Sequence, residues 1–130
     1  MNKISKISES ELEIMKVLWS KSFLSSNEII NLLEHKVTWS GQTIKTFLNR
    51  LLNKEVIGFK KEGRNYRYYP LISYEEYIKV ENKSFLERIY NGALDMLFSK
   101  FIEEEDLTEK DIEKLENILK EKKNDINSRD

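Results

Sequence analysis

The residues best suited to chemistry in this 130-residue chain form a polar stretch that starts at Ser40. Gln42 is of the type that pairs with N6 and N7 of adenine, and Lys45 can reach O6 or N7 of guanine. Thr46 suits a thymine methyl group or a phosphate. These side chains are spaced for the first turns of a helix that enters the major groove of DNA. The predicted DNA-contacting set in this stretch is Ser40, Gly41, Gln42, Thr43, Lys45, Thr46 and Arg50.

A helix must hold these side chains, and the sequence indicates one. Ser40 is a suitable N-cap, and Gly41 would let the backbone approach a phosphate at the helix N-terminus. Arg50 lies two turns further on and suits a phosphate contact. The apolar stripe at helical spacing comprises Ile44, Phe47, Leu48, Leu51 and Leu52. The polar side chains lie on the opposite face of the predicted helix.

A second basic set follows in a predicted β-hairpin. Residues 56–61 form one expected strand, 62–65 the turn and 66–69 the return strand, which Pro70 closes. Such a wing lies on the DNA backbone beside the groove and neutralises phosphates. The wing cations that we expect there are Lys60, Lys61, Arg64 and Arg67.

The earlier elements complete a recognisable order. Ser8 with Glu11 and Ser25 with Glu28 are capping boxes that open two further helices, and a short extended stretch at residues 23–24 separates them. We expect the second of these helices to end around residues 34–36. Helix, short strand, helix, helix and hairpin is the order of a winged helix-turn-helix. The fold class we predict is mainly α with a small β-hairpin wing.

The charge distribution divides the chain into two parts. The formal net charge is −1, but residues 1–72 carry a net +5 and residues 73–130 a net −6. A basic half can approach a polyanion while an acidic half stays away from it. We therefore expect a winged-helix DNA-binding domain over 1–72 and a helical dimerisation domain over 73–130.

The second half has more apolar surface than three short helices can bury. Ser73 with Glu76 and Ser84 with Glu87 are possible capping boxes, residues 82–84 are a candidate helix break, and Thr108 is a cap. The wide apolar faces predict packing against a second copy of the chain. The expected dimerisation residues are Phe85, Ile89, Tyr90, Leu94, Leu97, Phe98, Phe101, Ile102, Ile112, Leu115 and Leu119.

Composition argues against other classes of function. The chain has no cysteine and a single histidine, His35, so a thiolate metal site and a cysteine nucleophile are excluded. We expect neither an enzyme nor a metal or other cofactor. No stretch approaches about 18 apolar residues and no signal core precedes the first helix, so we expect a cytoplasmic protein without membrane insertion. Trp19 and Trp39 are expected to be core residues.

Residues 39–51, WSGQTIKTFLNRL, resemble the recognition helix of the penicillinase and methicillin-resistance repressors, the BlaI/MecI/CopY family. Residues 7–19, 68–71 and 101–107 are similar to other segments of that family, and the resemblance covers about residues 4–122. It implies a homodimer that represses resistance genes by binding palindromic operators. It also implies a fold with an N-terminal winged helix and a helical dimerisation region.

In the beta-lactam branch, the resemblance further implies a membrane sensor metalloprotease that triggers cleavage of the repressor. Carried onto this chain, the cut falls between Lys100 and Phe101, although Lys100 replaces the asparagine of the family pattern. The copper-responsive branch uses cysteine motifs that this chain lacks. Glu55 stands where the family has glycine, so we expect a different helix ending there.

Two alternatives remain open from the sequence. The chain could be a winged-helix regulator of unrelated genes, or a winged-helix protein-interaction module that never touches DNA. The basic face and wing favour DNA binding.

Overall fold

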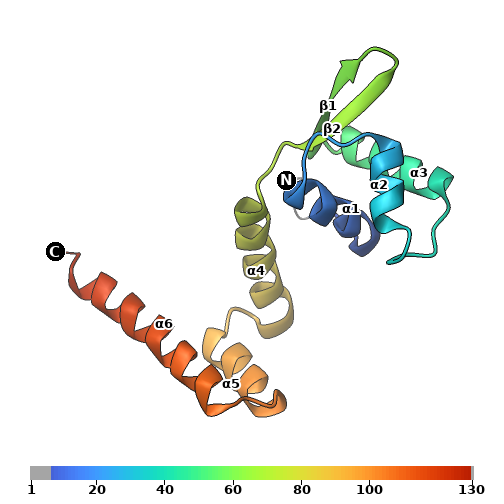
Figure 1. The fold of residues 1–130 in the computed structure, drawn as a ribbon. Coiled ribbons are helices and arrows are strands. Elements are labelled where there is room, and N and C mark those ends of the chain that lie inside the picture. Colours follow the sequence, from blue (N-terminus) through green and yellow to red (C-terminus); the bar gives the residue numbers. More distant parts are fainter. Residues whose placement is uncertain (1–6, 130) are drawn as a thin grey trace. The chain divides into compact units, whose positions relative to one another are not determined.

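The computed structural model describes residues 7–129, so residues 1–6 and 130, at the outer ends of the two expected domains, lie outside it. The fold is mainly helical with one antiparallel hairpin, as predicted (Figure 1). The elements in chain order are α1 (Glu9–Ser20), α2 (Ser26–Leu33), α3 (Gly41–Asn53), β1 (Ile57–Glu62), β2 (Asn65–Pro70), α4 (Tyr74–Tyr90), α5 (Leu94–Glu104) and α6 (Glu109–Asn127).

Each of the first three helices begins at a serine that takes up backbone N–H groups, which an α-helix otherwise leaves without partners. Ser8 Oγ accepts from the N–H of Glu11 at 3.1 Å, while the Glu11 carboxylate accepts from the N–H of Ser8 at 2.9 Å. Ser25 and Glu28 repeat this capping box. Ser40 Oγ accepts from the N–H of Thr43 at 3.2 Å. The three predicted helix starts are therefore confirmed.

One apolar core joins α1, α2, α3 and the base of the hairpin. Its fully buried side chains are Ile14, Met15, Leu18, Ile29, Leu33, Ile44, Leu48, Leu51, Val56 and Ile57. Trp19 and Trp39 are partly buried against this core, as expected. Trp19 also donates through Nε1 to the carbonyl oxygen of Ile72 at 2.9 Å. The core thus buries the apolar face of α3 and leaves the opposite, polar face exposed to solvent.

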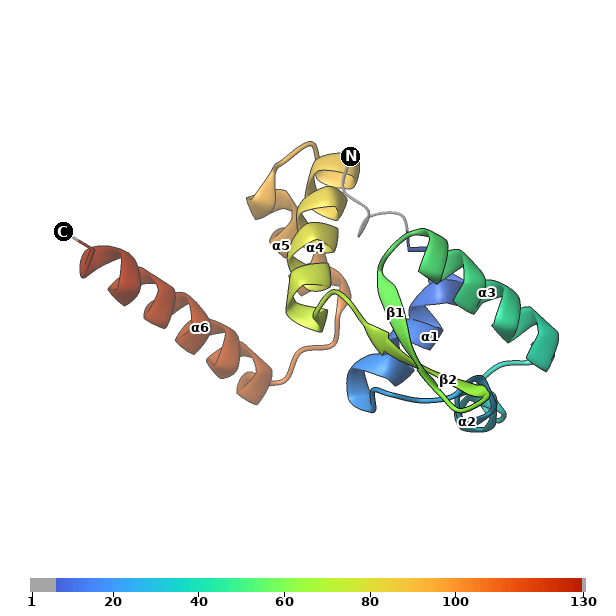
Figure 2. The same ribbon diagram turned by 90° about the horizontal axis from the view of Figure 1, so that it is seen from above.

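The two strands are joined by a turn of two residues, 63 and 64, whereas the sequence predicted a turn over residues 62–65. Its register pairs Phe59 with Tyr68 and Glu62 with Asn65. Gly63 takes φ +65° at the first turn position, a conformation that glycine adopts without cost. Leu24 forms a bridge to Tyr68, which confirms the extended stretch after α1. Figure 2 shows β2 passing over α1 and α2, so the hairpin is joined to both.

Two expectations about helix ends are wrong. Helix α4 continues through residues 82–84, because polar residues without a proline do not interrupt a helix that is otherwise satisfied. It ends at Tyr90, where Asn91 and Gly92 follow with φ of +51° and +83°. Glu55 adopts φ +61°, so this chain keeps a left-handed helix ending without a glycine.

Two compact units divide the chain at residues 85 and 86, rather than at the expected 72 and 73. The first unit therefore includes most of α4. Tyr77 of α4 is buried, and its ring lies 5.3 Å from that of Trp19. Sequence reasoning placed this residue in the second domain, and its packing was not predicted.

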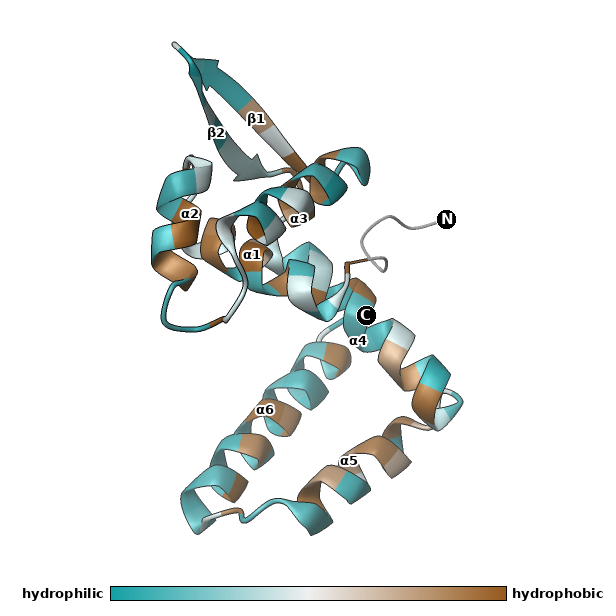
Figure 3. Ribbon diagram, turned by 90° about the vertical axis from the view of Figure 1, so that its right-hand side faces the viewer, coloured by the Kyte–Doolittle hydropathy of each residue, from teal (hydrophilic) through white to brown (hydrophobic). Residues whose placement is uncertain are grey.

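In the second unit, from residue 86 on, many large apolar side chains are exposed. Figure 3 shows the hydrophobic residues of α5 and α6 as brown segments of the ribbon. Phe98, Phe101 and Ile102 on α5 are 50%, 49% and 53% exposed, and Leu119 on α6 is 68% exposed. Leu97, by contrast, is already buried within one chain. None of the described helices is both long and apolar enough to cross a membrane.

Candidate nucleic-acid interface

The polar face of α3 is the principal candidate surface. Because Ile44, Leu48 and Leu51 are buried in the core, the helix turns Gln42 and Lys45 outward, and both are exposed. The two side chains lie near the helix N-terminus, where a helix in the major groove meets the base edges. The structure therefore brings the predicted reading residues together on one free face.

Two threonines of this face are already partly engaged. The Thr46 hydroxyl donates to the carbonyl oxygen of Gln42 at 3.1 Å. Its proton is therefore used within the helix, and Thr46 can offer a methyl group and an acceptor oxygen to DNA. The Thr43 hydroxyl lies 3.0 Å from Ser40 Oγ. That contact stiffens the helix start.

Arg50 is exposed and rests on an aromatic support. Its guanidinium carbon lies 5.6 Å from the centroid of the Phe47 ring, and Phe47 packs edge-on against Trp39 at 5.0 Å. A cation over a ring face is stabilised by the ring quadrupole. The stack directs Arg50 from the core outward, which suits the predicted phosphate contact.

Gly41 has a packing role that the sequence did not indicate. A Cβ atom at this position would lie 3.1 Å from Cδ1 of Ile30 on α2. The glycine therefore lets the start of α3 approach α2 closely. Its predicted approach to a phosphate stays a prediction.

The four predicted wing cations differ in their surroundings. Lys60, Lys61 and Arg64 are exposed, and Arg64 lies in the turn. Lys60 Nζ lies 5.0 Å from the centroid of the Phe23 ring. Arg67 is only partly exposed and is bound to protein acceptors. The structure thus presents three of the four cations on the outer part of the hairpin.

A buried ion pair holds the far end of α3. Lys54, the C-cap of α3, donates to Oε1 of Glu11 at 2.5 Å, and Glu11 is 1% exposed. Burial raises the pKa of Glu11, but the hydrogen bonds from Lys54 and Ser8 outweigh it and hold that pKa below its ordinary value. The sequence showed Glu11 only as part of a capping box. Its pairing with Lys54, 43 positions further along the chain, has no signal in the local sequence.

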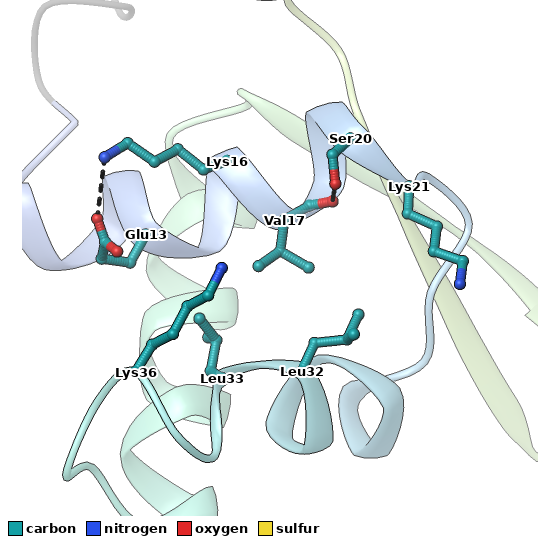
Figure 4. Close-up of a pocket in the computed structure, with 8 residues that line it drawn as sticks. All are labelled: Glu13, Lys16, Val17, Ser20, Lys21, Leu32, Leu33 and Lys36. Carbon is teal, nitrogen blue, oxygen red and sulfur yellow. Dashed lines mark hydrogen bonds and ion pairs between the residues drawn. The ribbon is translucent and has the colours of Figure 1, made fainter.

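A hollow between α1 and α2 is a separate feature, with a volume of about 280 Å³ (Figure 4). Val17, Leu32 and Leu33 line it together with lysines, and Glu13 on its edge is ion-paired with Lys16 at 3.2 Å. Ser20 also lines the hollow, but its hydroxyl donates to the carbonyl oxygen of Val17 at 3.3 Å, and the lining residues include neither a histidine nor a buried carboxylate that could activate it. The hollow does not resemble a catalytic site.

The expected cleavage site lies inside a helix. Lys100 and Phe101 are exposed residues of α5, and Lys100 faces Glu103 at 3.9 Å. Proteases bind their substrates as extended strands, so the helical backbone of α5 at this bond is not in a conformation that a protease could cut.

Comparison with known proteins gives consistent matches. The family model described as "Penicillinase repressor" matches residues 7–121. The penicillinase repressor of Bacillus licheniformis is 44% identical over 124 residues, which is 95% of this chain and 97% of that protein. The methicillin resistance regulatory protein MecI of Staphylococcus aureus (strain N315) is 36% identical over 121 residues, 93% of this chain and 98% of that one.

Solved structures of repressors also match this chain. The DNA-binding domain of the repressor BlaI matches with a TM-score of 0.53 and 46% identity, covering 60% of this chain and 95% of that one. The B. licheniformis BlaI bound to the blaP half-operator matches with a TM-score of 0.52, the same identity and the same coverage. A MepR mutant, 15% identical with a TM-score of 0.52, shares the fold over 95% of this chain and 84% of its own.

Proposed function

The chain belongs to the penicillinase repressor family, and we propose that it is a transcriptional repressor that reads operator DNA with α3. One observation carries this proposal. The buried stripe of α3 turns Gln42, Lys45 and Thr46 together toward solvent at the N-terminal end of the helix. The complex of the B. licheniformis relative with a half-operator supports the same use of the fold here.

Within this proposal, the two basic surfaces have different tasks. Gln42 and Lys45 discriminate bases, and each good bidentate contact contributes about 1–3 kcal/mol of discrimination. Lys60, Lys61 and Arg64 neutralise phosphates beside the groove, which contributes affinity without sequence preference.

We propose that the functional form is a homodimer. The half-exposed apolar side chains of α5 and α6 favour burial against a second copy. Two α3 helices would then enter successive major grooves of a palindromic operator, about 34–36 Å apart. Because linking two half-site contacts multiplies their strength, only the dimer would occupy the operator well.

Membership of the family supports a proposal about the regulated genes and the inducing event. We propose that the repressor acts in the cytoplasm on an operon of the beta-lactam resistance type. A membrane sensor metalloprotease would trigger cleavage between Lys100 and Phe101 after α5 opens. Loss of dimerisation would then lower operator occupancy without changing any DNA contact.

A binding experiment tests the proposed function. The full chain selects duplexes from a random pool, and its affinity for the selected duplex is compared with that for a scrambled one. We expect a preference for the selected duplex that the combined change Gln42→Ala, Lys45→Ala and Thr46→Ala removes, while salt-sensitive binding to the scrambled duplex persists. A preference that survives the triple change contradicts the role of α3, and no enrichment at all favours a protein-interaction module.

Mass spectrometry tests the proposed cleavage. The chain is recovered from cells exposed to a beta-lactam, and its intact mass is measured. We expect a fragment that ends at Lys100, and we expect less of it when Phe101→Ala is introduced. Unaltered cleavage of the variant, or a cut elsewhere in the chain, contradicts this site.

A further inference from the structure

Arg67 differs from the other basic residues of the hairpin in what it touches. Its Nη1 donates to the carbonyl oxygen of Phe23 at 3.1 Å and to Oε1 of Glu28 at 3.0 Å. Its Nε lies 2.9 Å from Oε2 of Glu62. The guanidinium thus faces two carboxylates and a carbonyl oxygen of the protein. One positive charge beside two negative ones is a poor attractor for a phosphate.

The carbonyl group that Arg67 binds belongs to a strained residue. Phe23 has φ +64°, a conformation that costs free energy for a bulky side chain. Three further contacts hold it in place. Its N–H donates to the Tyr68 carbonyl oxygen at 2.9 Å, its ring stacks on Tyr69 at 5.1 Å, and Lys60 lies over the same ring. Such strain persists only where the surroundings determine it, so this junction is held firmly.

The hairpin end of the junction is closely packed as well. A Cβ atom on Gly58 would lie 2.9 Å from the Tyr69 ring, so that ring lies directly on the β1 backbone. Gly58 and Tyr69 are opposite each other in the register. The stacked rings of Phe23 and Tyr69 therefore connect the segment after α1 to both strands.

Glu28 connects the same junction to α2. Its Oε1 accepts from the N–H of Ser25 at 3.0 Å as well as from Arg67. The carboxylate that closes the capping box of α2 is thus also the anchor of the hairpin. Arg67, a residue of β2, therefore links its strand to β1, to the segment before α2, and to α2 itself.

We infer that Arg67 is a positioning residue for the hairpin and makes no phosphate contact of its own. It fixes the hairpin against the start of α2, and this preorganises Lys61 and Arg64 for contact with the DNA backbone. The inference rests on the proposed DNA-binding function, and it revises the sequence-based assignment of Arg67 to the phosphate-contacting set.

The dependence of affinity on salt separates the two roles. Each phosphate contact that is lost lowers the slope of log K against log [salt] by about 0.9. The full chain is titrated with the selected duplex at several salt concentrations. We expect Lys61→Gln to lower the slope by about 0.9 for each hairpin. We expect Arg67→Gln to leave the slope unchanged, because the released hairpin still brings Lys61 and Arg64 to the phosphates in the complex. We expect its affinity to fall about three- to tenfold, because the free hairpin must be ordered on binding.

Glu28→Gln provides a second and independent readout. Glutamine still closes a capping box, so the start of α2 is kept. If Glu28 acted only through its charge, its replacement by glutamine would reduce the repulsion from the phosphates and strengthen binding to DNA. Positioning predicts instead that Glu28→Gln weakens binding about threefold and that it adds little to Arg67→Gln, because both changes break one contact. Glu76→Gln is the matched control, because Glu76 closes the same type of box with Ser73 on α4. We expect no change in affinity for this variant.

Failure of the inference and failure of the proposed function give different results. If the wild-type chain selects no duplex, the DNA-binding function itself is wrong. If it does select one, the inference is overturned by an Arg67→Gln slope that falls as for Lys61→Gln. It is also overturned by an Arg67→Gln affinity equal to that of the wild type, or by a Glu28→Gln affinity at or above it. Circular dichroism and the melting temperature confirm that each variant is folded.

Discussion

Glu11→Ala removes a buried carboxylate that serves two helices at once. The carboxylate accepts from the N–H of Ser8, which completes the cap of α1, and from Lys54 at the end of α3. Breaking a buried ion pair by removing one partner costs about 3–5 kcal/mol, and loss of a helix cap costs about 1 kcal/mol. The Lys54 side chain is 27% exposed, so water stabilises the ammonium group that is left behind. We therefore expect a loss near the lower end of the combined range, about 4 kcal/mol.

Urea unfolding followed by tryptophan fluorescence measures this loss. Both tryptophans, Trp19 and Trp39, lie in the unit of residues 1–85, so the signal reports the unit that contains Glu11. Glu13→Ala is the matched control, because it breaks only the exposed pair with Lys16, and we expect a loss below about 1 kcal/mol. A Glu11→Ala loss no larger than that of the control would refute the reasoning.

The pH dependence provides a second check with a defined sign. Burial raises the pKa of Glu11, but the hydrogen bonds from Lys54 and Ser8 lower it further, so the folded pKa lies below the ordinary value of 4.5. The stabilisation from the ionised group is therefore complete well above pH 4.5 and is lost as the pH falls through the folded pKa. We expect the stability difference between the wild type and Glu11→Gln to be constant near neutral pH and to shrink below pH 4.5. A difference that grows on acidification would contradict this assignment.

Three further predictions concern the backbone and the dimer. Glu55→Gly relieves the positive φ and should raise the free energy of unfolding by about 0.5–1 kcal/mol; a decrease in urea titration would contradict the strain. Gly58→Ala pushes the Tyr69 ring from the β1 backbone and should lower stability by about 1 kcal/mol, whereas an unchanged unfolding midpoint would show that the ring moves freely. Phe98→Asp with Ile102→Asp places charges on the open face of α5 and should give a monomer by analytical ultracentrifugation at micromolar concentration; a persistent dimer would locate the interface elsewhere.

The parts of the fold that could be predicted are those with local signals. Ser8 and Ser25 start helices because each is followed three residues later by a glutamate that closes a capping box, and Ser40 starts α3 by accepting from the N–H of Thr43. The apolar spacing of α3 determines which of its faces is buried. Thr108 caps α6 for the same reason. These features depend on neighbours within about four residues, so a single sequence contains them.

The parts that could not be predicted depend on contacts between distant segments or on backbone strain. Arg67 looks like any other cation of a basic wing, and only the fold brings Glu28 to it. The change in charge near residue 72 predicts that Tyr77 belongs to the second domain. In the structure its ring packs against Trp19 of the first unit, a contact that the charge distribution does not indicate. Glu55 was expected to avoid the left-handed region, but its preference is weaker than the packing of the elements on either side.

Base substitutions in the selected operator test the role of α3 most directly. The affinities of the wild type and of Gln42→Ala are measured against all four base pairs at every operator position. The account predicts that Gln42→Ala loses about 1–3 kcal/mol of discrimination at one position in each half-site and keeps the others. A uniform loss of affinity at all positions, with discrimination intact everywhere, would contradict it.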